Sequence, residues 1–133
     1  MTAQKRKFIV IDDNKLDCFI AEKIILNTGL SENVSVYTDA RETLEFIRND
    51  TGLDHDLKII ILVDIQMPLM NGFEFVEAFE QLPPETKNNY IIFMLTSSIN
   101  QSDLNRISNY SSVRQLLNKP LSIVKLSTMM ETL

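Results

Sequence analysis

Four short polar segments of the 133-residue sequence carry the side chains best suited to chemistry, and each follows a run of apolar residues. In chain order they hold Asp12-Asp13, Asp64, Thr96-Ser97 and Lys119-Pro120. Three carboxylates gathered in one cleft would repel one another and raise the pKa of at least one, unless a hard divalent cation neutralises them. Oxygen ligands with neither His nor Cys among them favour Mg²⁺, with Mn²⁺ as the alternative.

The same residue types suit phosphoryl transfer. A carboxylate beside bound Mg²⁺ is a nucleophile toward a phosphoryl group, giving an aspartyl phosphate, provided that charge on the transferring oxygens is stabilised. The Thr96 hydroxyl can donate to one such oxygen, and the Lys119 ammonium is a compact positive charge for another. Taken singly, Asp12-Asp13 is typical of a turn and helix cap, and Thr96 and Lys119 of strand-end and surface positions. Their conjunction at predicted strand ends favours the phosphoryl chemistry.

Short apolar strands and amphipathic helices alternate along the chain and must position these residues. Strands are predicted at residues 8–11, 34–37, 59–63, 90–95 and 113–117. A helix follows each strand, the first ending at Gly29 and the third at Pro83-Pro84. With right-handed crossovers, five strands and five helices close most simply as a flavodoxin-like, doubly wound α/β fold. Its parallel sheet would have the order 2-1-3-4-5, one of two common orders.

Length and composition predict one domain spanning residues 1–133, with no output domain after Lys119-Pro120. A net charge of −5 argues against direct nucleic-acid binding, which needs clustered Lys and Arg. No apolar run approaches the length of a membrane span and no signal peptide is evident, so we expect a cytoplasmic protein without membrane contact. The single cysteine, Cys18, is expected to be a small core residue.

These residues resemble the receiver domain of bacterial two-component response regulators, in particular the stand-alone, chemotaxis-regulator-like kind. The resemblance spans nearly the whole chain, and the Asp-x-x-Met-Pro-x-Met-x-Gly segment is its most specific part. It rests on Ile11-Asp12-Asp13-Asn14, Asp64-Ile65-Gln66-Met67-Pro68-Leu69-Met70-Asn71-Gly72, Leu95-Thr96-Ser97 and Asn118-Lys119-Pro120.

The resemblance implies a phosphorelay role for the chain. The phosphoacceptor would be Asp64, and Mg²⁺ would be held by Asp13, Asp64 and the backbone carbonyl of Gln66, with Asp12 acting mainly through a metal-bound water. A sensor histidine kinase or histidine phosphotransfer protein would supply the phosphoryl group from a phosphohistidine. A downstream protein would be the target. The chain would be no enzyme toward other substrates, because it promotes only its own phosphorylation and dephosphorylation.

The remaining roles also come from the resemblance. Lys119 would pair with the phosphoryl group, and the Lys119–Pro120 bond would be cis. Thr96 would swing toward the phosphoryl group as the conformational trigger. Gln66 and Ser98, two residues after Asp64 and Thr96, would tune the phosphate lifetime.

The chain departs from the family at Leu116, where an aromatic residue often reports the movement of the threonine. An alternative is therefore a receiver-fold protein-interaction module with weak or uncoupled phosphorylation, in which Leu116 is only a packing residue. The polar connection over residues 49–58, with the single histidine His55, is expected to be a surface loop. Glu74, Glu77 and Glu80 are expected to form a solvated stripe on the third helix.

Two other functional classes fit the sequence less well. A phosphohydrolase with an aspartyl nucleophile would place a second acid two residues after Asp64, to protonate the leaving group, and that position is Gln66. A flavin-binding protein of the same fold would need phosphate-binding donors after the first strand. Asp12-Asp13 would instead repel the phosphate.

Overall fold

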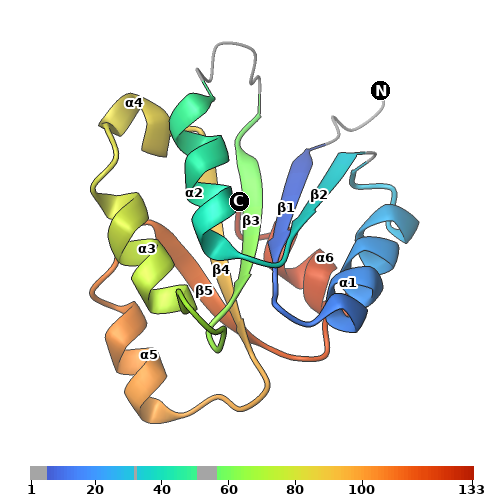
Figure 1. Ribbon diagram of the computed structural model, residues 1–133. Helices are drawn as coiled ribbons and strands as arrows, with labels where there is room; N and C mark the ends of the chain where they lie inside the picture. The colour runs from blue at the N-terminus through green and yellow to red at the C-terminus, as the bar shows by residue number, and fades with distance from the viewer. Residues whose placement is uncertain (1–5, 32, 51–56) are drawn as a thin grey trace.

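The computed structural model describes residues 6–31, 33–50 and 57–133. In this part of the chain, five parallel strands form one sheet in the order β2-β1-β3-β4-β5, which confirms the predicted flavodoxin-like fold (Figure 1). The strands are β1 (Lys7–Ile11), β2 (Asn33–Tyr37), β3 (Ile59–Asp64), β4 (Tyr90–Thr96) and β5 (Val113–Asn118). The helices are α1 (Lys15–Asn27), α2 (Ala40–Asn49), α3 (Gly72–Glu80), α4 (Pro84–Lys87), α5 (Gln101–Ile107) and α6 (Ile123–Met130).

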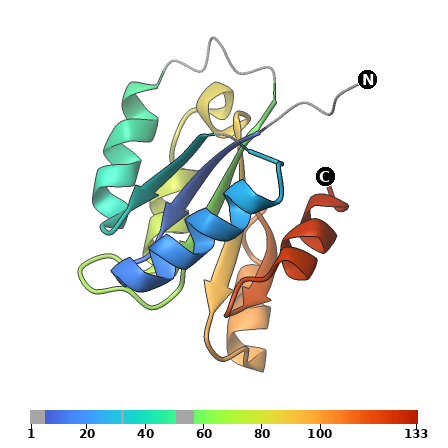
Figure 2. The same cartoon turned by 90° about the vertical axis from the view of Figure 1, so that its right-hand side faces the viewer.

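The central strands are buried along their whole length, because helices cover both faces of the sheet. Every residue of β3 and β4 is buried, as expected of continuous apolar runs in a parallel sheet. One core lies between the sheet and α2, α3 and α5, and the other between the sheet and α1 and α6. Figure 2 turns the side that carries α1 and α6 toward the viewer.

Helix caps fix where the chain turns away from the ends of β1 and β3. Asn14 caps α1 by accepting a hydrogen bond from the Asp17 backbone N–H at 3.0 Å. Asn71 and Glu74 form a capping box at the start of α3. Helix α1 begins two residues after Asp13, whereas α3 begins eight residues after Asp64, and both aspartate segments lie where β1 and β3 end, at the rim of the sheet.

The expectation of five helices is wrong, because the described residues contain six. Pro83-Pro84 follow the end of α3 as predicted, but they also open the one-turn α4. Proline suits the first position of a helix, since its φ is already helical and no backbone N–H is needed there. No helix among the described residues has the length and apolarity required to cross a membrane. The Lys119–Pro120 bond is cis, as expected, and His55 lies outside the described residues.

Candidate functional site

The carboxyl-terminal edge of the sheet brings the four polar segments together. Asp64 ends β3 beside Leu95 of β4, and Thr96 ends β4 beside Asn118 of β5. The backbone N–H of Lys119 donates to the carbonyl of Thr96 at 2.7 Å. The parallel register thus places the hydroxyl and lysine segments next to the central aspartate.

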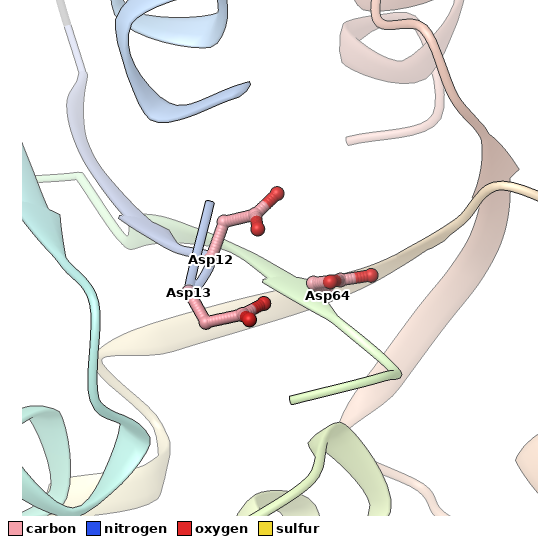
Figure 3. A group of neighbouring side chains, drawn as sticks. All are labelled: Asp12, Asp13 and Asp64. Atoms are coloured by element: carbon pink, nitrogen blue, oxygen red, sulfur yellow. The ribbon is translucent and has the colours of Figure 1, made fainter. Parts of the chain in front are cut away.

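Three carboxylates face a common space at this edge (Figure 3). One oxygen from each of Asp12, Asp13 and Asp64 lies within 4.8 Å of the others. Asp12 is 2% exposed and Asp64 is 7% exposed, whereas Asp13 lies open to solvent. This set of hard oxygen donors, accessible from one side, fits a small divalent cation that keeps several waters.

The Lys119 ammonium holds the buried carboxylates together. Its Nζ atom donates to Asp12 Oδ2 at 2.6 Å and to Asp17 Oδ2 at 3.1 Å, and it lies 3.5 Å from Asp64 Oδ2. Asp17 was not predicted as a site residue, because an acid in the first turn after the Asn14 cap is typical of any helix start. The signal that would have found it is its position on the turn of α1 that follows the acidic segment.

The pKa values of Asp64 and Lys119 are both raised, but for opposite reasons. Burial and, to a lesser extent, Asp12 raise the pKa of Asp64, Lys119 lowers it, and the net value is about 6. For Lys119, burial lowers the pKa, but its hydrogen bonds to Asp12 and Asp17 outweigh this and raise the value above that of an ordinary lysine. At neutral pH, Asp64 is therefore mostly ionised beside a fixed positive charge.

The connection between Asp64 and α3 approaches the β3 terminus closely at Gly72. A Cβ atom on Gly72 would lie 2.6 Å from the backbone oxygen of Asp64 and 2.9 Å from Met94 Cε. The Gly72 N–H also donates to the carbonyl of Ile65 at 2.8 Å. Only glycine leaves room for this packing, so Gly72 positions Asp64 although it carries no side chain of its own.

The residues expected to act in switching and tuning occupy distinct surroundings. The buried Thr96 hydroxyl donates to the Ser98 carbonyl and accepts from the Ser98 N–H, both at 3.2 Å. The exposed Gln66 donates its backbone N–H to the Asp64 carboxylate. Leu116 is 7% exposed and packs in the core on the α3 side, where it neighbours Met94.

Cys18 packs beneath the acidic cluster as a buried core residue. Its Sγ atom donates to the backbone carbonyl of Asp12 at 3.1 Å. Burial, chiefly, raises the pKa of the thiol to about 11. The burial of Cys18 confirms the expectation of a core residue. A thiol that stays protonated at neutral pH is also a poor nucleophile.

The α3 glutamates Glu74 and Glu77 are exposed, as expected of a solvated stripe, and Glu80 is half-buried, but all three also accept hydrogen bonds. Glu77 accepts hydrogen bonds from the Tyr110 hydroxyl at 2.6 Å and from Arg106 at 3.5 Å. Glu80 accepts from the backbone N–H and hydroxyl of Ser112, and Glu74 closes the capping box. The sequence pattern could not reveal the partners of Glu77 and Glu80, because they lie about 30 residues away, on α5 and on the connection between α5 and β5.

Known proteins and protein families are similar to this chain in sequence and in structure. The sequence model of the response regulator receiver domain matches residues 8–131. A response regulator receiver protein from Dyadobacter fermentans is 32% identical, with 96% of each chain covered and a TM-score of 0.85. Two-component response regulator 24 from Arabidopsis thaliana is 25% identical over 100% of this chain and 87% of its own length.

A third likeness concerns the fold alone. The receiver domain of the sensor histidine kinase PA1611 from Pseudomonas aeruginosa is 15% identical, with 97% of each chain covered and a TM-score of 0.75. Its structure has a magnesium ion coordinated in the active-site cleft.

Proposed function

This chain belongs to the response regulator receiver family of two-component signalling, and from that premise we propose that it accepts a phosphoryl group on Asp64. The donor is a phosphohistidine of a sensor histidine kinase or of a histidine phosphotransfer protein. The observation that carries the proposal is the buried Asp64 carboxylate, with two further carboxylates beside it and the Lys119 ammonium 3.5 Å away. The phosphorylated chain then acts on a downstream protein in the cytoplasm.

The proposed transfer uses Asp64 as the nucleophile. A carboxylate oxygen attacks the phosphorus atom, in line with the P–N bond of the phosphohistidine. A P–O bond forms as the P–N bond breaks, and the electron pair of the broken bond stays on the imidazole nitrogen. Since the pKa of Asp64 is about 6, the carboxylate is the prevailing form at pH 7. The chain promotes this step on itself and turns over no other substrate.

We assign a Mg²⁺ site to Asp12, Asp13 and Asp64, together with the backbone carbonyl of Gln66. The cluster of carboxylate oxygens within 4.8 Å supports this assignment, and Mn²⁺ has the same preference for oxygen ligands. When bound, the metal supplies positive charge that offsets the charge on the phosphoryl oxygens. The magnesium ion in the receiver domain of the Pseudomonas aeruginosa kinase is in keeping with the assignment.

Lys119 and Thr96 are proposed to respond to the new phosphoryl group. The ammonium of Lys119 has three N–H donors, and a phosphoryl oxygen on Asp64 competes with Asp12 and Asp17 for them. The Thr96 hydroxyl makes two hydrogen bonds with Ser98, both at 3.2 Å, so we expect its release to cost about 1 kcal/mol for each bond. Once released, it donates to the phosphoryl group and the Ser98 segment is freed to move.

The test is incubation with acetyl phosphate and Mg²⁺, followed by measurement of the intact mass. We expect a phosphoryl increment in the wild type, none in Asp64→Asn, and a slowed increment in Asp13→Asn. Glu42→Gln, an exposed carboxylate on α2, is the matched control and should behave as the wild type. The absence of an increment with any phosphodonor would contradict the proposal.

We further assign Gln66 and Ser98 to setting the rate at which water removes the phosphoryl group from Asp64.

A second candidate function is an interaction module in which phosphorylation is weakly coupled to the surface. The observation that favours it is Leu116, which is buried beside Met94 and has neither ring nor hydroxyl to report movement of Thr96. Amide hydrogen exchange with and without beryllium fluoride separates the two candidates. Unchanged exchange around Leu116 supports the uncoupled module, whereas altered exchange supports a switch.

A further inference from the structure

A polar cavity lies at the edge of the sheet opposite Asp64. Its volume is about 390 Å³, and its lining comes from the amino-terminal ends of β3, β4 and β5 and from α4. The six residues of β3 separate the two edges, which corresponds to about 20 Å of strand. Cavities of this size are typical of sites for small molecules.

Positive charge gathers on the lining of this cavity. Among the described lining residues, Lys58, Lys87 and Arg114 contribute three cations and Glu80 contributes the one carboxylate. The Glu80 Oε1 atom is already engaged by Ser112, through its N–H at 3.2 Å and its hydroxyl at 2.9 Å. Within residues 6–31, 33–50 and 57–133, no carboxylate pairs with any of the three cations. This local excess of positive charge stands out in a chain of net charge −5.

Two of these cations are held in place by neutral partners. Lys87 Nζ donates to the carbonyl of Glu80 at 3.1 Å, and an Arg114 guanidinium nitrogen donates to the carbonyl of Thr132 at 2.8 Å. A carbonyl fixes the position of a charged group without neutralising it. The ammonium and the guanidinium each keep further N–H donors, because they carry three and five in all. The cations are therefore oriented while their charge stays available to a ligand.

We propose that this cavity binds a small polyanion, whose phosphate or clustered carboxylate groups contact Lys87, Arg114 and Lys58. Ser111 also lines the cavity, and its hydroxyl adds a neutral hydrogen-bond donor. Ile91 and Val113 give part of the lining an apolar character. A hollow of this kind suits a compact ligand, and binding here is independent of the phosphorylation proposed at Asp64.

The proposal is tested by titrating the protein with inorganic pyrophosphate, and separately with citrate, while recording amide NMR spectra. Divalent cations are first removed from the protein and from both probes with a chelating resin, so that they cannot carry either probe to the acidic edge. We expect saturable shifts at Ser111, Ser112 and Arg114. Tighter binding of pyrophosphate identifies a phosphate ligand, and tighter binding of citrate identifies a polycarboxylate. Absence of saturable shifts at this cavity with both probes overturns the proposal.

Matched variants separate this site from general electrostatic attraction. The double variant Lys87→Gln with Arg114→Gln should weaken binding by at least about tenfold, because two charges in direct contact with the probe are lost. Lys23→Gln with Arg48→Gln also removes two positive charges, but from exposed positions on α1 and α2, and should leave the affinity for the probe unchanged. Equal weakening in both double variants contradicts a site. Lys58→Gln, whose side chain supports no described contact, gives an independent loss if the first double variant unfolds.

Discussion

Asp64→Asn is expected to stabilise the metal-free protein, although it removes the proposed phosphoacceptor. Burial raises the pKa of Asp64 most, Lys119 lowers it and Asp12 raises it, with the result that the folded-state value is about 6 against an ordinary 3.8. The ionised carboxylate is therefore held in the fold at a cost. A neutral amide of the same size avoids this cost, while Lys119 keeps its contacts with Asp12 and Asp17.

The size of the effect depends on pH in a defined direction. Below pH 3.8, the carboxyl group is protonated in both the folded and the unfolded chain and contributes no difference. Between pH 3.8 and about 6, the unfolded chain releases its proton first, so the wild type loses stability as the pH rises. Above about 6, the penalty is constant at about 3 kcal/mol, from about 1.36 kcal/mol for each tenfold change in proton affinity.

Urea unfolding of the wild type and of Asp64→Asn, in EDTA between about pH 4 and pH 8, measures this difference. We expect the free energies of unfolding to diverge as the pH rises, with the variant about 3 kcal/mol more stable at the upper end. Glu131→Gln, at an exposed position beyond α6, should show no such divergence. A difference that does not depend on pH, or a variant less stable than the wild type at neutral pH, would refute the reasoning about Asp64.

Adding Mg²⁺ should narrow the difference in stability between the wild type and Asp64→Asn in the same assay. A ligand bound only by the folded state stabilises it by about 1.4 kcal/mol at tenfold its dissociation constant. The wild type should gain this stabilisation, whereas Asp64→Asn, which lacks one ligand charge, should gain less. An equal gain in the two proteins would contradict a metal site that includes Asp64.

Three further predictions concern the supporting structure. Gly72→Ala should destabilise the protein by about 1–3 kcal/mol in urea, because the new Cβ meets the Asp64 backbone at 2.6 Å; unchanged stability would show that the loop yields freely. Thr43→Val should raise the free energy of unfolding by about 1 kcal/mol, since the buried Thr43 hydroxyl has no hydrogen-bond partner among the described residues. A decrease of about 1 kcal/mol in the free energy of unfolding would contradict this prediction. Burial raises the pKa of the Cys18 thiol to about 11, so this thiol should react with Ellman's reagent at about pH 8 only after unfolding. Rapid reaction of the native protein would contradict this prediction.

The fold could be predicted because the central strands leave a strong signal. The runs at residues 59–63 and 90–95 are apolar without alternation, which is what burial on both faces requires. The missed helix α4 spans only Pro84–Lys87. A single turn leaves no helical periodicity, and a proline pair is equally typical of a helix end.

The site could be predicted as far as strand ends determine it. Asp64 and Thr96 end strands, and Asp12 and Lys119 directly follow strands, so sheet order alone brings them together. Asp17 could not be found in this way, because its contact with Lys119 joins residues 102 positions apart through α1. The hydrogen bond between Glu77 and Tyr110 could not be predicted for the same reason, since it depends on how α3 packs against a connection that is distant in the sequence.

The phosphoacceptor itself can be identified by chemical trapping, which tests the central claim most directly. After incubation with acetyl phosphate and Mg²⁺, borohydride reduces an aspartyl phosphate to homoserine, and peptide mapping by mass spectrometry locates the reduced residue. The account predicts homoserine at position 64 and an unmodified carboxylate at Asp12 and Asp13. Reduction at another aspartate, or a stable phosphoryl group on the Thr96 hydroxyl with Asp64 intact, would contradict it.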